Sequence, residues 1–160
     1  MNGWKSKRGP SACLTRSSTT ACPSMKGDPL NPSDWLRAVS VDYERVLRAM
    51  DDADNGAAAL WLEQAAEKAM KGWLIGQGWV LVKTHDLERL ANECCVRGCD
   101  LSSFLPAGRR LKTLYFADRY VDDSPDAEPD EAEIESICGE VAKLIIALFP
   151  QFQPPCLPSS

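Results

Sequence analysis

The sequence predicts an all-α protein, an antiparallel (up-and-down) bundle of about five helices. Two observations lead to this fold class. Apolar residues recur every three to four positions in five separate stretches, whereas a strand-like alternation is almost absent. Short connections rich in Gly, Pro, Asn and Asp join these stretches, which places consecutive helices side by side in opposite directions. With 160 residues, 44% of them hydrophobic, the chain suffices for one domain with a substantial core.

The first two predicted helices are the longest. The first follows Asn31-Pro32-Ser33, with Ser33 as the expected N-cap, and its apolar stripe ends near Met50. Asp54-Asn55-Gly56 then interrupts the pattern. The second helix runs over about residues 57–77 and is dense in alanine, the strongest helix former. A short extended piece is expected at residues 79–82.

Three further helices complete the predicted bundle. The third begins near Asp86 and stops before Gly98, a residue type that commonly ends helices. The fourth covers about residues 108–120, and an acidic loop follows over residues 121–129. The fifth starts with acidic residues at its positive end, shows the cleanest helical period in the chain and closes at Pro150.

The predicted helices set the domain at residues 30–149. Residues 1–29 are expected to be a disordered basic arm or a mis-assigned start, because residues 1–24 carry four basic groups, no acidic group and no pattern that could pack. Translation from Met25 is one interpretation, and a functional basic arm is the other. Residues 150–160 are expected to form a flexible tail.

Composition excludes several classes of protein. The net charge of −5 argues against non-specific coating of nucleic acid. No apolar stretch is long enough to cross a membrane, and no signal peptide is evident, so we expect a cytoplasmic protein. Free thiols and no cofactor are expected. Cys94, Cys95 and Cys99 lie close together with His85 upstream, but a Cys-Cys-x-x-x-Cys pattern lacks zinc-ligand spacing, so no metal site is predicted.

Polar residues on the second predicted helix form one stripe, because Gln64, Glu67, Lys68 and Lys71 follow helical spacing. Glu67 and Lys71 make a favourable i,i+4 pair. A solvated face explains this stripe without any function, and a ligand-binding face is the alternative.

Two further segments carry polar groups that suit a site. In Lys83-Thr84-His85-Asp86, Thr84 or Asp86 could cap the next helix while the imidazole of His85 packs structurally or binds a ligand. Arg119-Tyr120 ends the fourth predicted helix, where a cation suits the negative end of the dipole. Neither segment identifies a function by itself.

Together these segments resemble the HEPN domain, an all-helical family, over about residues 33–148. The resemblance is carried by Trp35-Leu36-Arg37-Ala38, by Glu63-Gln64-Ala65-Ala66-Glu67-Lys68-Ala69-Met70-Lys71, by Lys83-Thr84-His85-Asp86-Leu87, and by Arg119-Tyr120 followed by Asp122. The second and third segments, in this order and at this distance, are the most specific.

The resemblance implies a small homodimeric bundle. Bacterial and archaeal members of this type resemble one half of a two-gene module whose other half is a minimal nucleotidyltransferase, in a toxin–antitoxin or defence setting. Many relatives are metal-independent endoribonucleases, in which an Arg is followed after four to six residues by a His. The Arg stabilises the phosphate, and the His acts as acid or base for attack by the RNA 2′-hydroxyl.

This chain departs from the ribonuclease motif. The positions where the His should follow Arg119 hold Ser124, Pro125 and Asp126, and no histidine follows His85. We therefore expect a non-catalytic HEPN protein that binds a nucleotidyltransferase partner, a nucleotide, or both. A metal-independent endoribonuclease that uses Arg119 with His85 is the alternative, and a plain helical scaffold is a third reading.

The expected binding residues follow from the resemblance and from their polarity. The Lys and Arg side chains would bind the phosphate groups of a nucleotide. The amide of Gln64 could form a hydrogen bond with the base or the ribose, and the ring of Tyr120 could stack on the base. The predicted nucleotide- or partner-binding residues are Gln64, Lys68, Lys83, His85, Asp86, Arg119 and Tyr120. RNA is a further possible ligand.

Overall fold

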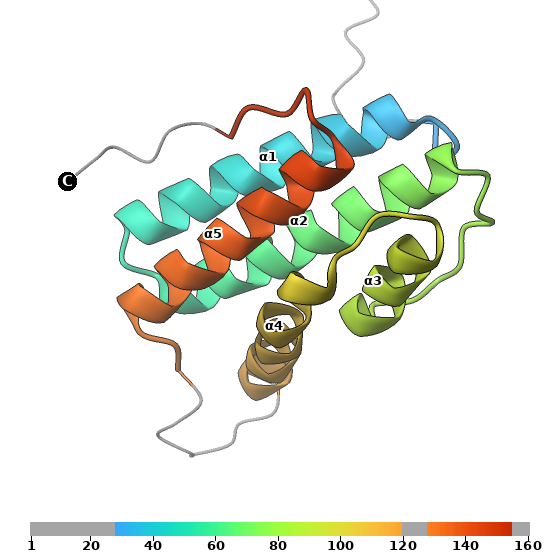
Figure 1. Ribbon diagram of the computed structural model, residues 1–160. Coiled ribbons are helices and arrows are strands. Elements are labelled where there is room, and N and C mark those ends of the chain that lie inside the picture. Colours follow the sequence, from blue (N-terminus) through green and yellow to red (C-terminus); the bar gives the residue numbers. More distant parts are fainter. Residues whose placement is uncertain (1–27, 120–127, 155–160) are drawn as a thin grey trace, which may run out of the picture.

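The computed structural model describes residues 28–119 and 128–154, with the side chains of residues 116–119 left out. Within these ranges the chain forms five α-helices, one 3₁₀ turn and no strand, which confirms the predicted all-α bundle (Figure 1). The elements are α1 (Pro32–Asp51), α2 (Asn55–Gly76), α3 (Leu87–Val96), η1 (Ser102–Phe104), α4 (Leu105–Arg119) and α5 (Glu131–Leu148).

Helix α2 is the centre of the bundle. Its most extensive contact is with α1, and it also packs against α3, α4 and α5 (Figure 1). Gly72 permits the close approach to α1, because a Cβ atom at this position would collide with the Cβ of Trp35. Small residues such as Ala58, Ala65 and Ala69 are fully or almost fully buried along the same helix. Neighbours therefore cover α2 on most of its circumference.

Local side-chain chemistry sets the helix starts. Asn31, not the predicted Ser33, caps α1: its side-chain oxygen accepts a hydrogen bond from the Ser33 amide at 3.0 Å. Pro32 occupies the first turn, where its missing N–H costs nothing. Helix α2 begins at Asn55, two residues before its predicted start, because Asp54 caps it through the Ala57 amide.

Helix α4 begins at Leu105, three residues before its predicted start at Gly108. The η1 turn leads directly into it, so the chain is already coiled when Gly108 is reached. Gly108 lies against the ring of Phe104, with only 3.1 Å from an added Cβ to Cε1 of the ring. The glycine therefore serves packing and does not mark a helix boundary.

The hydrophobic core is continuous through all five helices and reaches Phe152 beyond α5. The Phe152 ring packs edge-on against Tyr43 of α1, with 5.9 Å between centroids. The predicted domain limit at residue 149 lies three residues short of this contact. Tyr43 also reaches α5, because its hydroxyl lies 3.3 Å from Sγ of Cys138.

None of the described helices is long and apolar enough to cross a membrane. Several predictions fall outside the described residues: the N-terminal arm up to residue 27, the loop at 120–127 with Tyr120 and the three residues at 124–126, and the tail from residue 155. These stay predictions.

Candidate functional site

Two of the stripe residues on α2 are buried, not solvated. Glu67 and Lys71 face the interior, and Nζ of Lys71 donates a hydrogen bond to Oε1 of Glu67 at 2.7 Å. The predicted i,i+4 pair is therefore present, but it lies in the interior. Because a buried charge without a partner is costly, each residue of this pair depends on the other in the folded chain.

The second oxygen of Glu67 reaches across to the segment before α3. Its Oε2 lies 2.9 Å from Nδ1 of His85, whose side chain is 72% exposed. The buried carboxylate of Glu67 thus fixes one nitrogen of an exposed imidazole through Oε2. Lys71 balances the charge of the same carboxylate through Oε1. In the neutral tautomer that carries its proton on Nδ1, the Nδ1–H group donates a hydrogen bond to Glu67, which leaves Nε2 as an acceptor.

His85 lines a pocket of about 240 Å³ between α2, the segment before α3, and α4. Polar groups from three parts of the chain meet here, which is a common feature of binding sites. The residues that line the pocket are Glu63, Thr84, His85, Asp86, Leu87, Lys112 and Tyr115.

Glu63 is the most deeply buried acid of this pocket. Its Oε2 accepts a hydrogen bond from Nε2 of Gln64 at 2.7 Å. Burial raises the pKa of Glu63 above its ordinary value, and the nearby charge of Glu67 also raises it, whereas the hydrogen bond from Gln64 and the nearby charges of His85 and Lys71 lower it. An uncharged amide compensates a carboxylate only in part.

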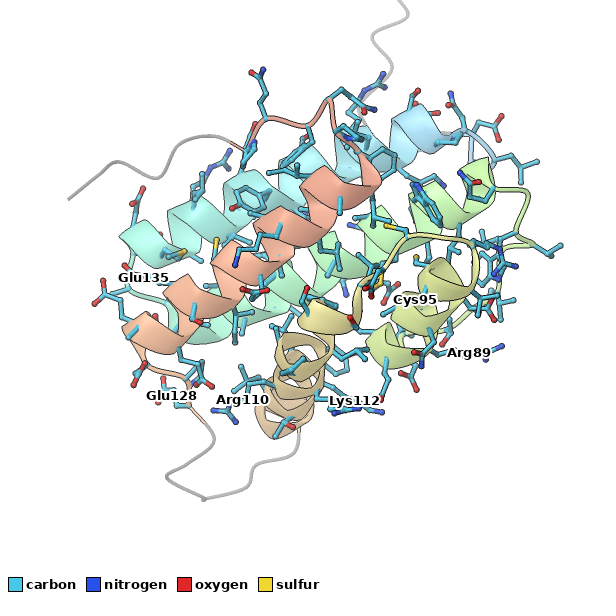
Figure 2. The ribbon with its side chains drawn as sticks, viewed as in Figure 1. Arg89, Cys95, Arg110, Lys112, Glu128 and Glu135 are labelled. Carbon is cyan, nitrogen blue, oxygen red and sulfur yellow. The ribbon has the colours of Figure 1, made fainter. Side chains whose placement is uncertain are left out.

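Asp86 joins the pocket to helix α3. It is the N-cap of α3, and its Oδ1 accepts hydrogen bonds from the amides of Glu88 and Arg89 at 3.1 and 3.2 Å. The ammonium of Lys112 lies 3.8 Å from Oδ2 of Asp86. Figure 2 shows Lys112 on the side of α4 toward α3, whereas Arg110 points to the other side, where it binds Glu133 of α5.

A second polar cluster lies between α1 and α2, away from the pocket lining. Lys68 forms an ion pair with the buried carboxylate of Asp42. The guanidinium of Arg45 lies 3.0 Å from the same carboxylate and 4.4 Å above the ring of Trp61. Two cations thus balance the charge of the buried Asp42, and the pair between Lys68 and Asp42 links α2 to α1.

The structure brings together only part of the predicted binding set. His85 and Asp86 line the pocket, and Gln64 touches it through Glu63. Lys68 is directed to Asp42 of α1 instead. Lys83 is exposed and has no ion pair with the described residues.

The last two predicted residues lie at the end of α4. Arg119 is the final residue of α4, and its backbone lies one helical turn beyond Tyr115, on the same face of the helix. Since Tyr115 lines the pocket, this face leads from the pocket toward the Arg119 position. Its side chain and Tyr120 lie outside the described part of the chain.

Sequence reasoning missed Glu63, Lys112 and Tyr115 as pocket residues. For Glu63 a signal was present, because it stands at i−4 from Glu67 in a helix otherwise rich in Ala and Leu. A helix that is apolar on most sides is buried, so its few charged residues cannot all reach solvent. No signal in the sequence pointed to Lys112, since its role depends on how α4 crosses α3.

The described cysteines are free thiols. Burial raises the pKa of Cys94 to about 12, and burial also raises the pKa of Cys138. Both lie in the core, as their place on apolar helix faces predicts. Within the described ranges no group of three or more His, Cys, Asp or Glu side chains is arranged to hold a metal ion.

The comparison with protein families identifies the class of protein. The model of the HEPN domain matches residues 32–149, which includes all five helices and the whole pocket lining. The chain therefore belongs to the HEPN domain family, as the sequence resemblance indicates. No curated protein and no solved structure matched in the other two comparisons.

Proposed function

We propose that this chain is a non-catalytic HEPN-domain protein that binds a minimal nucleotidyltransferase partner, a nucleotide, or both, as part of a toxin–antitoxin or defence module. We further propose that it acts as a cytoplasmic homodimer. The observation that carries the proposal is the number and position of the histidines in the sequence. The chain has one histidine, His85, and it precedes Arg119 by 34 positions in the sequence instead of following it. The family's ribonuclease motif therefore lacks its acid–base group.

The contacts suggest which residues would hold a nucleotide. Lys83 and Lys112 are exposed cations near the pocket, and the Arg119 position lies on the same face of α4 as Lys112 and Tyr115. Cations of this kind bind phosphate oxygens. Lys68 is a weaker candidate than the sequence indicated, because its ammonium is engaged by Asp42.

A second candidate is a metal-independent endoribonuclease with a relocated histidine. The contact between His85 and Glu67 favours it, because a carboxylate that orients an imidazole is a common arrangement for acid–base groups. In this case His85 would take or give the proton, and Arg119 would stabilise the phosphate.

An RNA cleavage assay in EDTA separates these two functions. It uses the wild type with His85→Ala, Arg119→Ala and, as a matched surface control, Lys143→Ala, whose cation pairs with Glu140 on α5. We expect no cleavage by the folded wild type. Cleavage that disappears in both His85→Ala and Arg119→Ala but persists in Lys143→Ala would overturn the proposal in favour of the ribonuclease.

Binding is tested separately by calorimetry with a panel of nucleoside triphosphates and by co-purification with a minimal nucleotidyltransferase encoded by an adjacent gene. Lys112→Ala should weaken nucleotide binding about tenfold, the effect of losing one charge-assisted hydrogen bond, whereas Lys143→Ala should not. If neither nucleotide nor partner binds the wild type, the binding function is rejected.

A further inference from the structure

Among the described residues, every buried charged side chain but one has an ion-pair partner. Four charged side chains are buried among the described residues: Asp42 at 1%, Glu63 at 3%, Glu67 at 6% and Lys71 at 6% exposure. Asp42 has two cations, Lys68 and Arg45. Glu67 and Lys71 neutralise each other. Glu63 has no ion pair with any described residue.

One oxygen of Glu63 is also unused. Gln64 donates to Oε2, and no described group donates to Oε1. Every fully buried side-chain oxygen and nitrogen of the described residues has a hydrogen-bond partner. Because Oε1 of Glu63 has none, this atom is not fully buried, and the residue lines the pocket. A carboxylate that is 97% buried thus presents a free acceptor to a cavity of about 240 Å³.

The rest of the pocket lining adds acceptors and an apolar wall. Thr84 contributes a hydroxyl that already accepts a hydrogen bond from the Asp86 amide at 3.2 Å and has a second lone pair. Asp86 contributes a second carboxylate, whose Oδ2 does not take part in the cap of α3, while Leu87 and Tyr115 provide apolar surface. The ammonium of Lys112 is nearest to Asp86, at 3.8 Å, and makes no described bond with Glu63. Charged residues that are buried without an ion pair are rare, and a cation bound in the pocket would supply the missing pair.

We propose that the Glu63 pocket binds a cationic nitrogen group, a primary ammonium or a guanidinium on an apolar stem. The N–H groups donate to Oε1 of Glu63 and to the acceptors of Thr84 and Asp86, and the stem lies against Leu87 and Tyr115. This chemistry has two sources, a free small amine or the end of a Lys or Arg side chain on a protein partner. The proposal does not rest on the proposed function.

The first experiment is an NMR titration of the isotope-labelled wild type with agmatine, butylamine and Nα-acetyl-lysine amide, with 1-butanol as an uncharged control. We expect the amide signals of residues 84–87 to shift with the three cations and not with 1-butanol. A preference for agmatine or butylamine over the lysine derivative indicates a free amine as the ligand. Equal binding of the lysine derivative indicates a side chain of a partner.

Two variants of equal charge change test the role of the carboxylate. Glu63→Gln keeps the shape of the side chain and removes its charge, and Glu140→Gln makes the same change on α5, where the native carboxylate pairs with Lys143. We expect Glu63→Gln to weaken amine binding about tenfold or more and Glu140→Gln to leave it unchanged.

Three results would overturn the proposal: no shifts at residues 84–87 in the wild type, equal shifts with 1-butanol, or a Glu63→Gln variant that binds the amines no more weakly than Glu140→Gln. Failure of the nucleotide or partner experiments leaves this titration unaffected, because it uses neither. Circular dichroism of Glu63→Gln confirms that the variant is folded.

Discussion

At the scale of single residues, burial decides what a charged side chain does. The sequence assigns Gln64 and Lys68 to a binding face, yet the structure engages the first with Glu63 and the second with Asp42. Removing Lys68 would therefore disturb the packing of α1 on α2 before it affected any ligand. Glu63 is the opposite case, because it is buried without an ion pair among the described residues, and burial opposes its ionisation.

We predict that Glu63→Gln is more stable than the wild type at pH 7 when no amine is present. Burial raises the pKa of Glu63 in the folded state, so the ionised carboxylate costs stability at neutral pH. As the pH falls through this raised pKa, the wild type takes up a proton and the cost disappears. The stability difference, measured by urea unfolding, should therefore shrink from pH 7 to pH 4.

The control for this prediction is Glu140→Gln, which should show no such gain, since its carboxylate is paired near the surface. A variant Glu63→Gln that is less stable than the wild type at pH 7 would contradict the prediction. It would show that the Glu63 charge is already compensated within the folded chain.

At the scale of elements, α2 determines the arrangement of the bundle. The small alanine side chains of α2 allow α1, α3, α4 and α5 to approach it from different sides. Each polar residue of α2 then contacts the element that packs over its side of the helix. Glu67 meets the segment before α3, and Lys68 meets α1, although the two residues are adjacent in the sequence. The site is a consequence of this central position.

We predict opposite effects for two glycine-to-alanine changes. Gly72→Ala should cost about 1–3 kcal/mol, because the new Cβ collides with Cβ of Trp35 and separates α1 from α2. Gly139→Ala should stabilise the protein by about 0.5–1 kcal/mol, since this glycine lies in the exposed middle of α5 with open space around it.

Chemical denaturation of the two variants measures both free energies. If both changes stabilise the protein, helix propensity outweighs packing at Gly72, and the close contact of α1 with α2 is not as tight as described. A loss in Gly139→Ala would mean that another molecule or segment covers this face of α5.

At the scale of the whole molecule, the segment after α5 closes the bundle. Phe152 lies against Tyr43 of α1, and Tyr43 in turn lies against Cys138 of α5. Residues of α1, of α5 and of the segment after α5 thus meet at one point. The family match ends at residue 149, so this contact extends the domain beyond its matched range.

We predict that Phe152→Ala destabilises the protein by about 3–5 kcal/mol, through the lost burial of the ring and the cavity it leaves against Tyr43. The exposed neighbour Gln151 provides the control, and Gln151→Ala should change the free energy of unfolding by less than about 0.5 kcal/mol. Thermal or urea unfolding checks both. Equal effects of the two changes would rule out a packing role for Phe152.

The sequence alone determined the helical class, the approximate positions of the five helices and the family. Apolar periodicity is a local property, so residues a few positions apart suffice to reveal it. The sequence also shows that no histidine follows Arg119; Ser124, Pro125 and Asp126 stand where the resemblance to the ribonucleases of the family leads one to expect it.

Only the tertiary structure decided which polar residues form a site. Periodicity shows that Glu63, Glu67 and Lys71 share a side of α2, but it does not show which element covers that side. The contact between Glu67 and His85 joins residues 18 positions apart, and Lys112 reaches the pocket because α4 packs beside α3. Such contacts depend on how helices pack across the core, which the local pattern of a chain does not specify.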